Sequence, residues 1–145
     1  ARHDAAKHMS ATVVGDAKLS LETLATEMSG HKAPADWTAM AQAERAKWND
    51  YVSENTRVGN GPASYAQAIG EVNRLCGPRD RVVAAAGGLP AEVTANWKTL
   101  DIGTVDVEFG FSCMGYEIAG GWGARIGQSQ MEPNSDTIVL TGPIF

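Results

Sequence analysis

The chain has 145 residues, of which 43% are hydrophobic, and its formal net charge at pH 7 is −5. This length and apolar content suffice for one domain with a buried core, or for a section of a larger protein. The acidic balance argues against a nucleic-acid partner, because a basic surface is needed to neutralise phosphates. No apolar run approaches the roughly 20 residues that span a bilayer, so a membrane partner is not expected either.

The cysteines and histidines predict neither a disulfide framework nor a metal site. Cys76 and Cys113 lie far apart in different sequence contexts, which favours reduced thiols in a cytoplasmic protein. His3, His8 and His31 lie in the N-terminal quarter without the spacing of metal ligands. The N-terminus also lacks both a starting Met and an apolar signal core, as expected of a processed piece.

The first 61 residues predict mainly helices. Thr12–Val14 predicts a short strand, and the leucines after it recur at helical spacing behind Ser20 as a possible N-cap. Asp36 can cap a second helix with an aromatic face, which we interpret as packing anchors rather than a ligand cage. That face comprises Trp37, Met40, Trp48, Tyr51 and Val52. The turn-forming residues 55–62 predict the main boundary of the chain.

After this boundary, helices and strands alternate. A helix headed by Ser64 precedes a continuous apolar strand, Arg81–Ala86, and Pro90 fits the first turn of the next helix. A strand over Val105–Phe109, a glycine-rich helix and a strand over Thr137–Thr141 follow. This order is typical of βαβ units, so the sequence predicts an α/β fold with a parallel sheet.

Glycine-rich loops follow two of the three predicted strands. Residues 86–88 and 110–115 would therefore lie at the carboxyl edge of the sheet, where ligands of such folds bind. The helix after the second loop also has small residues on one stripe. Either an anionic ligand approaches that backbone closely, or the helix lies flat on the sheet, and the pattern alone favours the second interpretation.

Two segments resemble the start of the diphosphate-binding domain of thiamine-diphosphate-dependent enzymes: GPASYAQAIGEVNRLCGPRDRVVAAAGGLPAEVTANW and VEFGFSCMGYEIAGGWGARI. Within this superfamily, the loop from Gly110 to Glu117 is most similar to that of the hydrolases that cleave a cyclic 1,2-dione in inositol catabolism. The resemblance implies three parts. Residues 1–30 would be the tail of a middle α/β domain, 31–61 a helical interdomain linker, and 62–145 a truncated cofactor-binding domain with a partial, three-layer parallel sheet.

The resemblance also implies where the cofactor binds. The first glycine loop would approach the diphosphate, and the backbone around Ser112 and Met114 would meet the aminopyrimidine. The Met114 side chain would wedge between the two rings and hold the cofactor bent, a role that suits a flexible apolar side chain. The implied cofactor-binding residues are Gly87, Gly88, Leu89, Ser112, Cys113, Met114 and Gly115. No catalytic residue is implied: Cys113 is not expected to act as a nucleophile, and Glu117 is interpreted as a solvated or structural carboxylate.

The family's metal motif is not matched. Members carry Gly-Asp-Gly after the last strand and hold Mg²⁺ with it, whereas Pro143 follows Gly142 here. The activating glutamate of the family belongs to the N-terminal domain of a neighbouring subunit. Two hypotheses follow: a section of the hydrolase, inactive alone, or a non-catalytic α/β binding module that oligomerises. The expected partners are a second copy of the chain or the missing domains of the parent enzyme.

Overall fold

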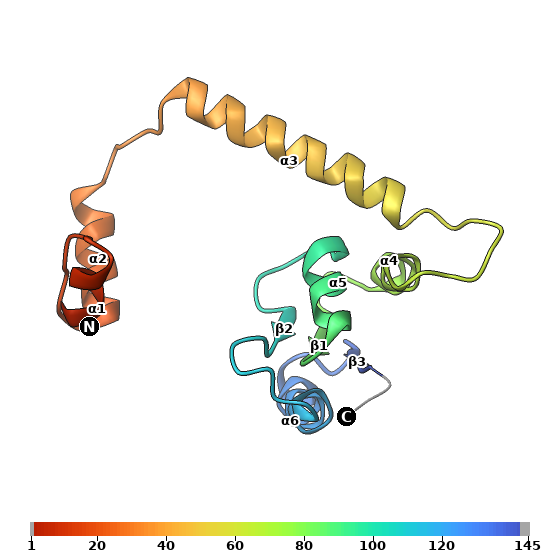
Figure 1. The fold of residues 1–145 in the computed structure, drawn as a ribbon. Coiled ribbons are helices and arrows are strands. Elements are labelled where there is room, and N and C mark those ends of the chain that lie inside the picture. The colour runs from red at the N-terminus through yellow and green to blue at the C-terminus, as the bar shows by residue number, and fades with distance from the viewer. Residues whose placement is uncertain (1, 143–145) are drawn as a thin grey trace. The chain divides into compact units, whose positions relative to one another are not determined.

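The computed structural model describes residues 2–142, and the chain divides into two compact units between residues 43 and 44. The first unit contains α1 (Arg2–Lys7), α2 (Ala17–Glu27) and the beginning of α3 (Ala35–Asn55), as Figure 1 shows. No residue of α2 is buried. Within residues 2–142, no helix combines the length and the apolar character needed to cross a membrane.

Three local predictions for this region are wrong. Thr12–Val14 lies in a loop, because a strand needs a pairing partner and the described part of the chain offers it none there. The N-cap of α2 is Asp16 instead of Ser20, since the Asp16 carboxylate accepts a hydrogen bond from the Leu19 amide at 3.0 Å. Helix α3 begins at Ala35, so Asp36 lies within its first turn instead of preceding it, although its carboxylate accepts from the Trp37 amide at 2.9 Å.

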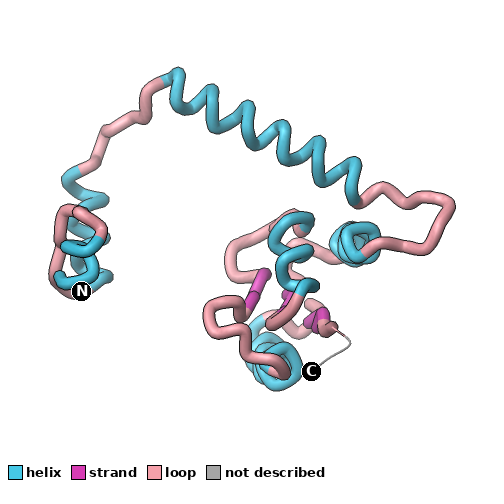
Figure 2. The backbone as a smooth tube through the Cα atoms, in the orientation of Figure 1, coloured by secondary structure: helices cyan, strands magenta, loops and turns pink. Residues whose placement is uncertain are grey.

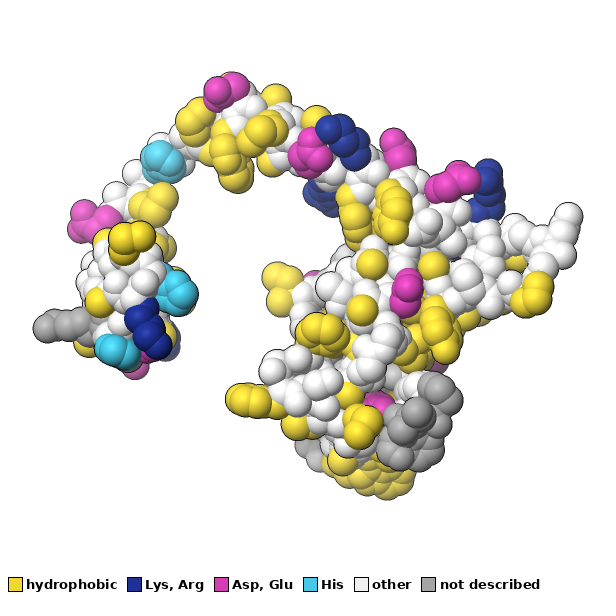
Figure 3. Space-filling view, in the orientation of Figure 1, with side chains coloured by type: hydrophobic (Ala, Val, Ile, Leu, Met, Phe, Trp, Pro, Cys, Tyr) yellow, Lys and Arg dark blue, Asp and Glu magenta, His cyan; other side chains and the backbone are white. Residues whose placement is uncertain are grey.

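The aromatic face of α3 is mostly exposed. Val52 is the only buried residue of the helix within the described chain, and Tyr51 is 56% exposed. Trp48 has one specific contact, because its indole N–H donates to the Ala95 carbonyl at 3.2 Å. The space-filling view shows hydrophobic side chains along this helix (Figure 3). The predicted packing of the aromatic side chains is therefore not seen in this structure.

The second unit contains a three-stranded parallel sheet, which confirms the predicted α/β class. Strand β1 (Arg81–Ala84) lies between β2 (Val105–Val107) and β3 (Thr137–Leu140), as the magenta segments in Figure 2 show. In this register Val83 is opposite Asp106 on one side and Val139 on the other. Strand β1 is central, which explains its continuous apolar sequence.

Helices cover both faces of this sheet. On one face lie α4 (Tyr65–Leu75) and α5 (Gly88–Asn96), and on the other lies α6 (Tyr116–Met131), as Figure 1 shows. The core under α4 and α5 consists of Ile69, Val82, Ala84, Val93 and Trp97. Helix α4 begins after Ser64 as predicted, because Ser64 and Gln67 form a reciprocal capping box. Because the three strands are parallel, their carboxyl ends lie at the same edge of the sheet.

Helix α6 packs directly on the sheet through one of its glycines. A Cβ atom added to Gly121 would lie 2.4 Å from Val139 Cγ2, so no larger residue fits without movement. A Cβ atom added to Gly123 or to Gly127 would meet no atom within 4 Å. The close contact at Gly121 supports the interpretation that small residues let this helix lie flat on the sheet.

Candidate functional site

A pocket of about 590 Å³ lies at the carboxyl edge of the sheet. Segments that are far apart in sequence meet there: the start of α4, the loop between β1 and α5, the loop before α6, and the residues after β3. The lining residues are Tyr65, Ala86, Gly87, Gly88, Leu89, Met114, Thr141 and Gly142. Its size is within the range of small-molecule sites in proteins.

The structure brings four of the seven predicted binding residues into this pocket. Gly87, Gly88, Leu89 and Met114 contribute to its lining, and Met114 is 66% exposed. The other three, at positions 112, 113 and 115, belong to the same loop as Met114 but are not in the lining. Tyr65 was not predicted; its position at the start of a helix headed by a good cap gave no indication of a pocket.

The start of α5 is suited to an anionic group. Gly87 is the N-cap residue, with φ of 98° and ψ of −164°, and no side chain caps the helix. The first-turn amides of Gly88 and Leu89 therefore lack a side-chain acceptor, while Pro90 has no amide hydrogen. Such an N-terminus attracts negative charge through its amides and the helix dipole.

Glu108 organises the loop that precedes α6. Its carboxylate accepts hydrogen bonds from the amides of Phe111, at 3.0 Å, and Cys113, at 2.6 Å. Both bonds lower the pKa of Glu108, and the bond from Phe111 has the larger effect. Between the two donors, Ser112 adopts a positive φ of 54°. The loop amides at 111 and 113 thus bind the chain itself and are not available to a ligand. Strand β2 stops at Val107 and does not reach the predicted Phe109, although the Glu108 amide still donates to the Ala84 carbonyl at 3.0 Å.

We expect this loop to loosen in acid. Because the folded-state pKa of Glu108 is lowered, its stabilising effect is complete above the unfolded-state value, about 4.3, and is lost as the pH falls through the folded value. The amide proton shifts of Phe111 and Cys113 should titrate together in an NMR pH series, with a midpoint below the usual carboxyl value. The Glu108→Gln variant should not show this titration. A midpoint at or above the usual carboxyl value would contradict the assignment.

The beginning of α6 contains a buried carboxylate. Gly115 is the N-cap residue, in the left-handed region with φ of 89°, and Glu117 is only 3% exposed. Of the two interpretations of Glu117, the solvated one is wrong and the structural one holds, because its oxygens accept bonds from the Gly115 amide and the Thr141 hydroxyl. Nearby, the Tyr116 hydroxyl donates to Asp106 at 3.1 Å, and this bond raises the pKa of Tyr116.

Cys76 and Cys113 are free thiols. Between residues 2 and 142 there is no group of three or more His, Cys, Asp and Glu side chains that could hold a metal ion. Pro143, at the position of the family's metal-binding aspartate, lies outside the described residues.

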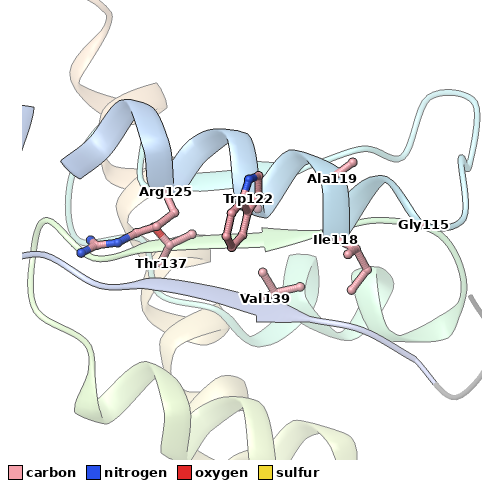
Figure 4. Close-up of a pocket in the computed structure, with 8 residues that line it drawn as sticks. Gly115, Ile118, Ala119, Trp122, Arg125, Thr137 and Val139 are labelled. Carbon is pink, nitrogen blue, oxygen red and sulfur yellow. The ribbon is translucent and has the colours of Figure 1, made fainter. Parts of the chain in front are cut away.

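A second cavity, of about 620 Å³, is lined by residues of α6 and β3. Figure 4 shows the side chains of Ile118, Trp122 and Val139 around it, with Arg125 at one end. Trp122 is 73% exposed. We call this cavity the α6–β3 groove. Its surface is largely apolar, and a large exposed apolar surface often marks a contact site.

Comparisons with known proteins identify similar enzymes. The chain is 30% identical to 3D-(3,5/4)-trihydroxycyclohexane-1,2-dione hydrolase of Geobacillus thermodenitrificans over 154 aligned positions, covering 90% of the chain and 23% of that protein. It is 38% identical to a hydrolase of the same name from Bacillus cereus over 74 positions, covering 51% of the chain and 11% of that protein. A Bacillus thuringiensis hydrolase of this name is 36% identical over the same length.

The predicted resemblance to this group of dione hydrolases is therefore confirmed. The chain spans only about a quarter of the length of the Geobacillus relative, as the 23% coverage shows. No protein-family model and no solved structure matches the chain.

Proposed function

We propose that this chain forms the diphosphate-side wall of the cofactor site in a thiamine-diphosphate-dependent hydrolase that cleaves a carbon–carbon bond of a cyclic 1,2-dione. The observation that carries the proposal is the pocket at the carboxyl edge, where the 87–89 loop, Met114 and Gly142 meet. The names of the similar hydrolases support the reaction class and the substrate class.

The lining residues fit the organic part of this cofactor. The uncapped amides at the start of α5 suit a diphosphate, and the missing side chains of Gly87 and Gly88 leave room for it. Leu89 and Met114 give an apolar surface for rings. When bound, thiamine diphosphate supplies the electron-sink chemistry that carbon–carbon bond cleavage needs. The chain's own part is to bind and orient it.

The described residues do not fit a magnesium ion. None of the pocket-lining residues has a carboxylate, and Mg²⁺ requires a near-octahedral set of oxygen ligands. In the sequence, Pro143 offers no side-chain oxygen either. We therefore assign no step of the reaction to a metal held by this chain.

We further propose that turnover requires regions beyond the 145 residues. The matched region makes up 23% of the Geobacillus hydrolase, so most of that enzyme lies outside it. The parts that would choose the dione and activate the cofactor are not among the lining residues of the pocket. The purified chain should therefore show no dione hydrolysis, and measurable hydrolysis would overturn this proposal.

Isothermal titration of the purified chain with thiamine diphosphate, with and without Mg²⁺, tests the cofactor assignment. We expect saturable binding that inorganic diphosphate competes away and that Mg²⁺ does not strengthen, since the pocket has no carboxylate ligand. Binding that requires the metal would show that ligands are supplied from elsewhere, for example across a dimer. The absence of heat in both titrations would contradict the cofactor assignment.

The α6–β3 groove favours a second candidate function, a non-catalytic module that oligomerises. Its exposed Trp122 and apolar surface resemble an interface that lacks its partner. This candidate predicts a concentration-dependent oligomer in sedimentation velocity, whether or not thiamine diphosphate is added. A strictly monomeric chain at working concentration would contradict it.

A further inference from the structure

Glu117 makes more contacts than a helix cap needs. It is the second residue of α6 and only 3% exposed, and burying a carboxylate is costly unless its oxygens are hydrogen-bonded. One oxygen, Oε2, accepts from the amide of the N-cap residue Gly115 at 3.1 Å. The other, Oε1, accepts from the Thr141 hydroxyl at 2.9 Å. The second bond has no role in capping the helix.

The two donors belong to two segments that each contribute lining residues to the pocket. Gly115 directly follows Met114, which lines the pocket from the loop before α6. Thr141 lines it from the end of β3, and Gly142 follows. The Thr141–Glu117 bond spans 24 residues of sequence, so one buried side chain joins the beginning of α6 to the end of β3. A carboxylate can accept from both donors at once. A glutamine side chain could accept from only one of them with its oxygen, and its NH₂ group would need the Thr141 hydroxyl to turn and act as the acceptor.

A comparable buried side chain, Gln128, lies near the other end of α6. Gln128 is 4% exposed, and its Nε2 donates to the Arg79 carbonyl at 3.0 Å and to Ser135 Oγ at 2.6 Å. It therefore joins the same helix to the amino ends of the strands, away from the pocket-lining residues. Gln128 supplies a matched control of similar burial and bonding.

We propose that Glu117 is a positioning residue that fixes the loop carrying Met114 to the end of β3, and so sets the separation of these two lining segments. The identity of the ligand rests on the proposed function, whereas the link that Glu117 makes between Gly115 and Thr141 does not depend on it. Glu117 does not touch the cofactor in this assignment. It acts through Gly115 and Thr141, and it holds the backbone on which Met114 and Gly142 are presented.

Four variants test the proposal: Glu117→Ala, Glu117→Gln, Thr141→Val and the control Gln128→Ala. We expect Glu117→Ala to weaken thiamine diphosphate binding at least 10-fold in calorimetry and to speed hydrogen exchange at the Gly115 and Gly142 amides. Glu117→Gln should stay within about threefold of the unmodified chain, because Oε1 can keep the Gly115 bond and the Thr141 hydroxyl can accept from Nε2. Gln128→Ala should lower stability while leaving both readouts unchanged.

Thr141→Val keeps the proposal testable if Glu117→Ala does not fold. It removes the hydroxyl donor with little change of shape and leaves the Gly115 bond in place, and it should speed exchange across residues 110–115. Unchanged exchange there in both Glu117→Ala and Thr141→Val would overturn the proposal, as would an equal loss of binding in Gln128→Ala. If the unmodified chain binds no thiamine diphosphate, the proposed function fails, and the exchange data still decide the role of Glu117.

Discussion

Replacing Gly121 by alanine is expected to lower the free energy of unfolding by about 1–3 kcal/mol, the usual cost of forcing extra volume into a packed site. The added Cβ would lie 2.4 Å from Val139 Cγ2, a distance that real side chains do not adopt. Val139 is β-branched, so it has little freedom to turn away. Urea unfolding followed by circular dichroism at pH 7 measures the change.

Gly123, two residues further along the same helix, is the matched control. A Cβ added there meets no atom within 4 Å, so Gly123→Ala should raise the free energy of unfolding by up to about 1 kcal/mol through helix propensity alone. Adding Val139→Ala to Gly121→Ala should recover part of the loss, because it removes the clashing methyl group. Equal stabilisation by both single substitutions would contradict the close packing of α6 on the sheet.

The sequence predicted those parts of the fold that depend on local pattern. The continuous apolar run Arg81–Ala86 indicated a strand buried on both faces, and β1, which ends two residues earlier at Ala84, is the middle strand of the sheet. Ser64 indicated a helix start, and it forms the capping box of α4. The topological rule for parallel strands then placed the two glycine loops at one edge, and residues of both line the pocket.

The failures arise where a long-range contact, or the lack of one, decides the structure. Thr12–Val14 has the composition of a strand but no neighbouring strand to pair with in the described chain. One of the two hydrogen bonds that Glu117 accepts comes from Thr141, which is 24 residues away in sequence and becomes its neighbour only when β3 joins the sheet. The acceptor role of Glu108 depends on a tight loop whose turn the spacing did not specify. No periodicity encodes such contacts.

Replacing Gly87 by alanine is expected to cost about 1–3 kcal/mol of stability and also to weaken thiamine diphosphate binding. Its φ of 98° with ψ of −164° lies in a region of backbone space that is essentially restricted to glycine. An alanine there must either adopt that strained conformation or turn the peptide planes that begin α5. Turning them would misdirect the Gly88 and Leu89 amides, which the proposed function assigns to the diphosphate.

Gly103→Ala separates strain from function. Gly103 also has a positive φ, of 77°, with open space around the position of a Cβ, but it is not among the pocket-lining residues. Both variants should lose stability in urea unfolding, because both place alanine where glycine is favoured. Only Gly87→Ala should reduce affinity in the calorimetric titration. If Gly103→Ala reduced affinity equally, a general loss of stability would explain the effect. If Gly87→Ala bound as tightly as the unmodified chain, the start of α5 would not be the diphosphate site.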